Sequence, residues 1–254
     1  MIKLDRLTVG YGKKPVLEEI SLTLECGKLI ALVGINGSGK TTLLKTAAGM
    51  IPPLGGCVSV NGKKLSLATP KERAKQIAYL PQSRSLPDMT VEELVLHGRF
   101  CHVPFPGIYS DKDRLAAAGA MKRVGIEDLS GTHLRVLSGG MRQKAYIAMA
   151  LAQESGHILL DEPATYLDVS QKLGLMKELR QLAAEGKCIL AVLHDLTLAM
   201  EYADLVAVVH EGRVIRMAPP EEILNANILQ TVFSVKITKI EDGEHHAYRY
   251  SELN

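Results

Sequence analysis

A short glycine-rich segment at residues 34–41 constrains the fold of this chain more than any other feature. It lies between an apolar run at residues 28–33, which has the length of a buried strand, and residues 41–48, whose pattern favours a helix. Glycine adopts backbone conformations that other residues resist, so a glycine-rich segment permits a sharp reversal. The segment contains, in order, Gly34, Ile35, Asn36, Gly37, Ser38, Gly39, Lys40 and Thr41. The chain is therefore predicted to form a strand, a tight loop and a helix here.

The spacing of this segment matches the pattern Gly-x-x-x-x-Gly-Lys-Ser/Thr, in which backbone N–H groups surround phosphate. The following helix adds the positive end of its dipole. Lys40 is predicted to reach the β- and γ-phosphates of a nucleotide, and the Thr41 hydroxyl to ligate Mg²⁺. A glycine-rich turn formed by chance is the alternative, which the strand–loop–helix context disfavours. The predicted nucleotide-binding residues are Gly34, Asn36, Gly37, Ser38, Gly39, Lys40, Thr41 and Thr42.

Two adjacent carboxylates follow a second apolar run, residues 158–160. Asp161 is predicted to hold Mg²⁺ near Thr41, and Glu162 to lie beside the γ-phosphate as a general base or water-polarising residue. Two acids at a strand end are common and would alone indicate only a solvated terminus. Together with the glycine-rich loop they indicate nucleotide hydrolysis.

The rest of the chain alternates strand-length apolar runs with helical patterns. Fully apolar strands between helices favour a mostly parallel sheet covered on both faces. Strands are expected at residues 28–33, 77–80, 158–160, 187–193 and 205–209, and helices at 41–48, 139–152, 170–184 and 196–202. Residues 2–9 and 20–24 indicate antiparallel strands added at one side.

Two segments depart from this alternation. Between about residues 87 and 152 the strand signal disappears, with helices predicted at 91–99 and 112–124 around a loop at 101–110. A helical subdomain is therefore predicted over about 87–152, inserted into a core of about 1–86 and 153–233. The remaining residues, about 234–254, indicate a β-hairpin with a turn at Asp242 and Gly243.

Composition excludes several classes of protein. The chain has 254 residues, 46% of them hydrophobic, and a net charge of +2 without a cluster of basic residues, so a nucleic-acid partner is not expected. No apolar run approaches the ~18–20 residues that span a bilayer, and the first residues do not resemble a signal peptide. The four cysteines form no CxxC pair, Cys188 is expected to be a buried thiol, and a reducing compartment is the simplest interpretation.

The segment Leu137, Ser138, Gly139, Gly140, Met141, Arg142 and Gln143 resembles the LSGGQ signature of ABC ATPases. It lies just before the carboxylate strand, as it does in that family. Ser138, Gly139 and Gly140 open a helix and so offer a second anion-binding end. The resemblance covers essentially the whole chain and implies an α/β fold: a P-loop NTPase, RecA-like core with an antiparallel β subdomain and an inserted α-helical subdomain.

Further residues match other positions of the family pattern. Tyr11 corresponds to the aromatic residue that stacks on adenine, and Gln82 to the residue that approaches Mg²⁺ and the attacking water. Residues 164–168 resemble the D-loop, and His194 the histidine that bonds the γ-phosphate. The departures are Ala164, Lys144 and Met149, where the family usually has Thr or Ser, Arg and Arg; they put details of D-loop coupling in doubt.

The resemblance implies ATP and Mg²⁺ as cofactors and a head-to-tail dimer with a second copy of the chain. Each ATP then lies between the glycine-rich loop of one protomer and Ser138, Gly139 and Gly140 of the other. Because the γ-phosphate bridges two surfaces, ATP joins them and hydrolysis separates them.

The resemblance further implies transport. The groove lined by residues 82–89 and parts of 92–108 would receive a helix of a multi-span membrane permease, with Leu86, Met89 and Phe100 as apolar contacts. The stretch from Gly98 and Arg99 to Asp113 looks like that of importers for iron-siderophores, haem and vitamin B12. Separate permease and solute-binding subunits would follow, with this chain peripheral at the cytoplasmic face of the membrane.

Other interpretations stay open from the sequence. A soluble ABC ATPase of an assembly system, such as iron–sulfur cluster assembly, would share every nucleotide motif, and so would an exporter subunit; a kinase-like enzyme would leave the signature unexplained. His97, Cys101 and His102, or His245 and His246, lack recognised metal-ligand spacing, and solvated loops are the favoured reading.

Overall fold

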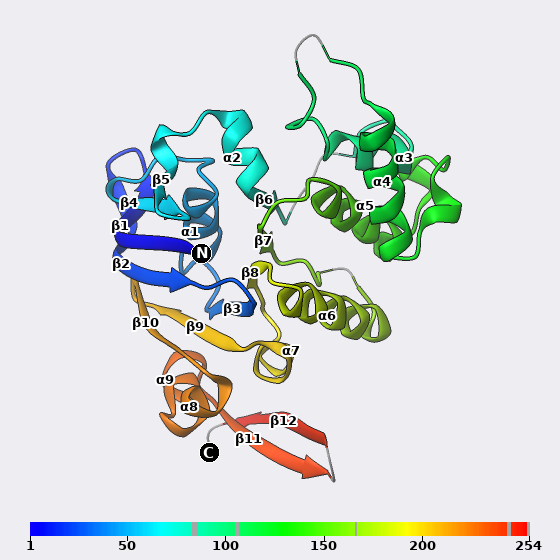
Figure 1. Ribbon diagram of the computed structural model, residues 1–254. Helices are drawn as coiled ribbons and strands as arrows, with labels where there is room; N and C mark the ends of the chain where they lie inside the picture. Colours follow the sequence, from blue (N-terminus) through cyan, green and yellow to red (C-terminus); the bar gives the residue numbers. More distant parts are fainter. Residues whose placement is uncertain (83–85, 105–106, 166, 243–244, 253–254) are drawn as a thin grey trace.

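The computed structural model describes residues 1–82, 86–104, 107–165, 167–242 and 245–252. A six-stranded sheet with the order β10-β9-β3-β8-β7-β6 lies at its centre (Figure 1). All neighbouring pairs are parallel except β9 and β10. The strands are β3 (Lys28–Gly34), β6 (Ile77–Leu80), β7 (His157–Asp161), β8 (Cys188–Val192), β9 (Leu205–His210) and β10 (Arg213–Ala218). The five apolar runs expected to be strands are thus confirmed, and β10 is an edge strand that the sequence analysis missed.

Alternate residues of β3 belong to two different hydrophobic cores, as the pleat of a strand requires. Leu29, Ala31 and Val33 face one core, and Ile30 and Leu32 face the other. The first core contains residues of α6 (Val169–Ala184) and α7 (Leu196–Tyr202), and the second contains residues of α1 (Lys40–Ala47). Both faces of the sheet are therefore covered, which explains its uniformly apolar strands.

A second, antiparallel sheet with the order β2-β1-β4-β5 packs over α1. Its strands are β1 (Ile2–Tyr11), β2 (Lys14–Leu24), β4 (Gly55–Val60) and β5 (Lys63–Lys64). The sequence analysis missed β4, which begins with two glycines. Gly56 has φ +71°, and a Cβ there would lie 2.2 Å from the carbonyl oxygen of Arg6, so only glycine fits beside β1.

Helices occupy the chain between β6 and β7 and form a lobe beside the sheet (Figure 1). They are α3 (Val91–His97), α4 (Asp111–Arg123) and α5 (Gly139–Ala152), with 3-10 turns at Glu127–Leu129 and Leu134–Val136. The helix predicted to reach residue 99 ends at His97. Gly98 approaches α5 so closely that a Cβ would lie 2.2 Å from the carbonyl oxygen of Met149, and the chain turns there.

The other elements are α2 (Pro70–Gln76) before β6, and a C-terminal group of α8 (Pro220–Asn225), α9 (Ile228–Phe233), β11 (Val235–Asp242) and β12 (His245–Glu252). β11 and β12 form the predicted hairpin and pack beside α9 and α7. The turn residue Gly243 lies outside the described residues. Within the described part of the chain, no helix combines the length and apolar character that crossing a bilayer demands.

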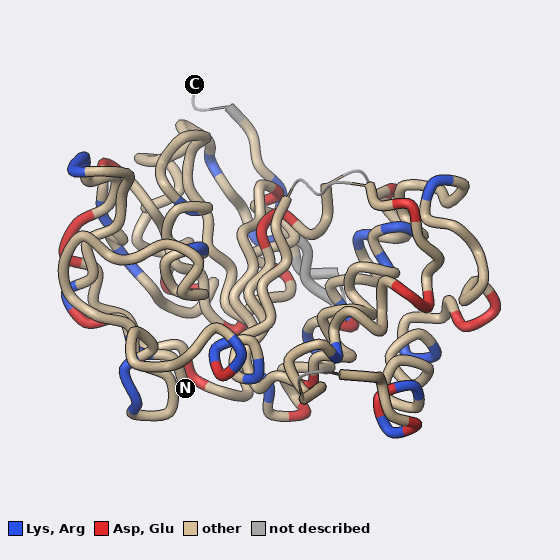
Figure 2. The backbone as a smooth tube through the Cα atoms, turned by 90° about the horizontal axis from the view of Figure 1, so that it is seen from above, with Lys and Arg blue, Asp and Glu red and all other residues tan. Residues whose placement is uncertain are grey.

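Charged residues are concentrated at the periphery of the molecule. In Figure 2, Lys and Arg positions alternate with Asp and Glu positions along the outer loops and helices, while the strands through the middle carry few of either.

Cys188 is buried, as the sequence analysis expected. Its burial is the main reason that the pKa of its thiol is raised to about 12.

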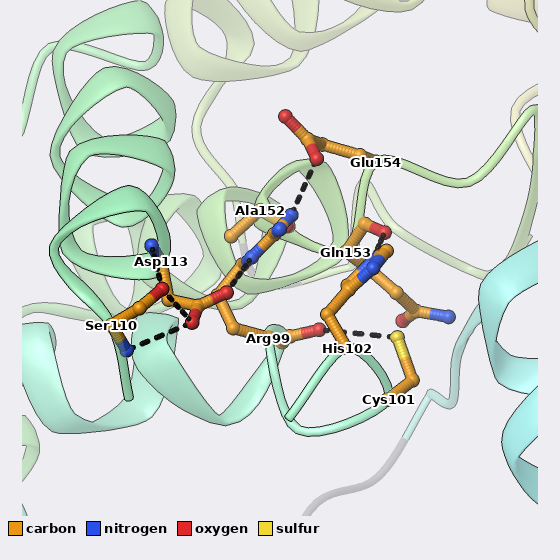
Figure 3. A network of polar contacts seen from close by, with 9 residues as sticks. Arg99, Cys101, His102, Ser110, Asp113, Ala152, Gln153 and Glu154 are labelled. Carbon is orange, nitrogen blue, oxygen red and sulfur yellow. Dashed lines mark hydrogen bonds and ion pairs between the residues drawn. The ribbon is translucent and has the colours of Figure 1, made fainter. Parts of the chain in front are cut away.

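A buried arginine fixes the loop that follows α3 (Figure 3). Arg99 is 2% exposed, and its Nε donates to Asp113 Oδ1 of α4 at 3.0 Å. Its Nη1 donates to the carbonyl oxygen of Ala152 and to Glu154 Oε2, both at 2.7 Å. Hydrogen bonds from Ser110, and then the Arg99 guanidinium, lower the pKa of Asp113 to about 2. The Arg99–Asp113 pair of the importer-like stretch thus joins α3, α4 and the end of α5.

Cys101 and His102 follow Arg99, and the sequence analysis expected both in a solvated loop. This expectation is wrong for Cys101. Cys101 is buried beneath this loop, and His102 Nε2 lies 3.0 Å from the carbonyl oxygen of Gln153 (Figure 3). Both side chains therefore serve packing of the loop against the end of α5.

Replacing Arg99 by Met is expected to lower the free energy of unfolding by about 3 kcal/mol, because it leaves the Asp113 carboxylate buried without its cation. Differential scanning calorimetry should show a melting temperature about 6–12 °C lower.

The pKa of Asp113 is lower in the folded protein than its ordinary value of 3.8. The ionised carboxylate therefore stabilises the native state at pH values above 3.8. That contribution should disappear as the pH falls toward 2, and the Asp113→Asn variant should lack this pH dependence.

Arg114→Met is the matched control, since Arg114 meets Glu92 only at 3.9 Å and both side chains are about half exposed. It should change the free energy of unfolding by no more than about 0.5 kcal/mol. Equal melting temperatures for the two variants would contradict a structural role for the Arg99 network.

Candidate functional site

The glycine-rich loop follows β3 directly and α1 begins at Lys40. Gly37 and Gly39 have φ +78° and +96°, a region in which other residues are strained. A Cβ on Gly39 would also lie 2.6 Å from Val16 Cγ1 of β2. The loop therefore requires glycine at Gly39 for both conformation and space.

Lys40 is 5% exposed and lies across the loop. Its Nζ donates to the carbonyl oxygens of Gly34 and Ile35, both at 2.8 Å. Burial lowers the pKa of Lys40, while the charges of Glu162 and Asp161 act in the opposite direction. The ammonium group is thus held inside the loop, near the two carboxylates.

Asp161 lies at the end of β7 and is 1% exposed. The hydroxyl of Thr41 donates to Asp161 Oδ1 at 3.0 Å, and Tyr79 OH donates to Oδ2 at 3.4 Å. Burial raises the pKa of Asp161, which the hydrogen bond from Thr41 partly offsets. Two of the three predicted metal ligands, Thr41 and Asp161, are therefore adjacent, and a hydroxyl beside a carboxylate is the oxygen donor set that Mg²⁺ prefers.

Glu162 joins three segments that are far apart in the sequence. Gln82 Nε2 donates to Glu162 Oε2 at 2.5 Å, and Thr165 Oγ1 donates to the same oxygen at 3.2 Å. His194 Nε2 is in direct polar contact with Glu162 Oε1. Gln82, which was also predicted as a metal ligand, therefore faces the carboxylate of Glu162.

An open cavity of about 580 Å³ lies over these groups. It is lined by Val16, Asn36, Gly37, Gly39, Lys40, Thr41, Thr42, Gln82, Glu162 and His194.

The sequence analysis did not predict Val16 as a lining residue, because an apolar residue in a strand gives no functional signal in the sequence. Tyr79 was missed too, although a hydroxyl in an otherwise apolar strand was a usable clue. Tyr11, at the end of β1, is 54% exposed and is not among the described lining residues.

The signature residues lie at the start of α5. Ser138 is the N-cap of that helix, and its hydroxyl accepts a hydrogen bond from the backbone N–H of Met141 at 3.3 Å. Gly140 is buried against α6, and a Cβ there would lie within 2.4 Å of three Gln171 side-chain atoms. Among the described residues, none from the signature lines the cavity at Lys40.

A parallel sheet with a glycine-rich loop after one strand and paired carboxylates after another defines a P-loop NTPase. The ABC transporter family profile matches residues 17–165, more than half of the chain. The chain belongs to the ABC transporter family. The resemblance found in the sequence and the predicted fold class are thereby confirmed.

Two relatives match nearly the full length of the chain. The ferric enterobactin transport ATP-binding protein FepC of Escherichia coli is 38% identical over 94% of this chain and 89% of its own length. The iron(3+)-hydroxamate import ATP-binding protein FhuC of Bacillus subtilis is 37% identical over the same shares. Among solved structures, the dimeric ATP-binding cassette MJ0796 bound to ADP and Pi has a TM-score of 0.76 and 27% identity, with 87% of this chain and 99% of that chain covered.

Lys40→Ala is expected to abolish stabilisation by Mg-ATP, because it removes the cation placed for the phosphates. For wild type, ligand at a hundred times its Kd should add about 2.7 kcal/mol to the free energy of unfolding. Thermal shift with and without Mg-ATP measures this difference. Lys63→Ala, on exposed β5, is the control and should keep the shift. A full shift in Lys40→Ala would contradict the predicted role.

Proposed function

We propose that this chain is the ATP-binding and ATP-hydrolysing subunit of an ABC importer for iron-siderophore, haem or cobalamin-type substrates. One observation carries the proposal: the Glu162 carboxylate contacts the side chains of Gln82 and His194. All three residues line the same cavity as Lys40 and Thr41. The iron-siderophore part of this proposal is supported by the names of two relatives, which print ferric enterobactin transport and iron(3+)-hydroxamate import.

In the proposed mechanism, Lys40 and the loop amides bind the β- and γ-phosphates of ATP. Thr41 and Asp161 would hold Mg²⁺, which would neutralise phosphate charge. The Glu162 carboxylate would accept the proton of the attacking water, and His194 would bond the γ-phosphate. Since Glu162 now contacts Gln82 and His194, bound nucleotide must compete with these contacts.

A second copy of the chain is required to complete the proposed site. Ser138, Gly139 and Gly140 begin α5, where free N–H groups and the helix dipole favour an anion. In the proposed head-to-tail dimer these residues contact the γ-phosphate bound by the other protomer. Tyr11 is proposed to stack on adenine, for which its 54% exposure leaves room.

The proposed permease surface consists of α2 and the loop after α3. A cavity of about 580 Å³ lies there, lined by Pro70, Lys71, Ala74, His97, Gly98, Phe100, Cys101, Val103, Pro104, Gly107, Tyr109 and Gln153. Phe100, which lines this cavity, and Ile108, in the same loop, are 72% and 89% exposed, and exposed apolar side chains favour a protein partner. Met89, a predicted contact, is partly buried against the core instead. A peripheral position at the cytoplasmic face and a separate solute-binding subunit complete the proposal.

Glu162→Gln should lower kcat for ATP hydrolysis at least about a hundredfold and leave ATP bound, because the amide cannot accept the water proton. A phosphate-release assay and the elution volume with Mg-ATP should show a slow enzyme that accumulates as a dimer. Glu25→Gln, an exposed site, should match wild type. Wild-type turnover in Glu162→Gln would remove Glu162 from its role.

A double variant, Phe100→Asp with Ile108→Asp, should lose co-purification with a multi-span membrane protein but keep the ATPase rate of the isolated chain. The apolar side chains contact the permease in the proposal, and neither lines the nucleotide cavity. Affinity purification in mild detergent, with wild type alongside, measures the difference. A stable complex of wild type only with soluble proteins would favour an assembly ATPase instead.

A further inference from the structure

Gln143 joins the signature helix to the segment that follows the carboxylates. It lies on α5, one helical turn after Gly139, and its Nε2 donates to the carbonyl oxygen of Pro163 at 2.6 Å. Pro163 is the residue immediately after Glu162. A single side chain therefore spans from the helix whose N-cap is Ser138 to the peptide beside Glu162.

The backbone at Glu162 needs such support. Glu162 has φ +51°, a region that non-glycine residues occupy at a cost and that persists only when surrounding contacts enforce it. The backbone N–H of Thr165 donates to the carbonyl oxygen of Glu162 at 3.3 Å, and Pro163 has no N–H to contribute. The carbonyl oxygen of Pro163 is thus the point at which α5 restrains this turn.

Further described residues line the seam between α5 and α6. Gly140 meets the Gln171 amide, which also closes a capping box with Asp168 at the start of α6. A cavity of about 280 Å³ separates the helices, lined by residues that include Gly140, Gln143, Leu167 and Gln171. Gln143 and Gln171 thus place amide groups of both helices along this cavity.

We infer that Gln143 is a positioning residue for hydrolysis, which transmits the position of the signature helix to Glu162 of the same protomer. This inference rests on the proposed roles of Glu162 and of Ser138, Gly139 and Gly140. When the start of α5 engages the phosphate bound by the partner, Gln143 carries any shift of that helix to the Pro163 peptide. The state of one ATP site thereby reaches the carboxylate of the other site.

The test compares the full-length chain with Gln143→Met, which keeps side-chain length but removes the amide donor. ATPase kinetics should show kcat lowered about tenfold, as expected for loss of the hydrogen bond to Pro163, with KM for ATP within about twofold. The melting temperature should stay within about 3 °C of wild type. Gln181→Met is the matched control, because the hydrogen bond that Gln181 Nε2 makes within the described part of the chain goes to the exposed Glu185, the C-cap of the same helix.

Gln143→Glu is a second variant that also removes the donor, and it serves if Gln143→Met does not fold. Wild-type kcat in a folded variant would overturn the inference, and so would a KM that rises as much as kcat falls together with a much lower melting temperature. Glu162→Gln separates the two claims. If Glu162→Gln is inactive and Gln143→Met is fully active, only the inference fails; if Glu162→Gln is active, the proposed function fails.

Discussion

The parallel register of the central sheet is the constraint on which the rest of the structure depends. Leu80 pairs with Leu160, Asp161 with Val192, and Leu32 with Val192. Because parallel strands end at one edge, the residues just beyond β6, β7 and β8 converge there. These are Gln82, Glu162 and His194, and the glycine-rich loop follows β3 at the same edge. Hydrophobic burial of both sheet faces therefore brings the polar residues of the site together. No local sequence signal shows that these residues lie near one another.

Specific polar contacts order the helical lobe and supplement the hydrophobic cluster that it shares with the core. Arg99 joins α3 and α4 to the end of α5, and Gln143 joins the start of α5 to Pro163. Arg123 of α4 also donates to Glu178 of α6 and to Glu185, the C-cap of that helix. Charged and amide contacts of this kind have directional geometry, so the lobe keeps a defined orientation although a cavity of about 280 Å³ lies between α5 and α6.

Much of this arrangement was predictable because its signals are local. The glycines at Gly37 and Gly39 adopt positive φ, and Asp161 and Glu162 follow a buried strand, so spacing alone identified them. Features that depend on distant contacts were not predictable. The glycines of β4 obscured a strand whose partner is β1, Val16 reaches the cavity from another sheet, and the depth of Arg99 depends on α4 and α5. The domain boundaries, the ligand role of each site residue and the Tyr11 contact stay predictions.

The central claim is that ATP lies between two copies of this chain, contacted by glycine-rich segments from both. A crystal or cryo-electron-microscopy structure of the Glu162→Gln protein with Mg-ATP tests it most directly. The account predicts that Ser138 Oγ and the N–H groups of Gly139 and Gly140 lie within hydrogen-bond distance of the terminal phosphate held by the partner's Lys40. A nucleotide-filled dimer in which Ser138 faces solvent, or a filled monomer at saturating ATP, would contradict it.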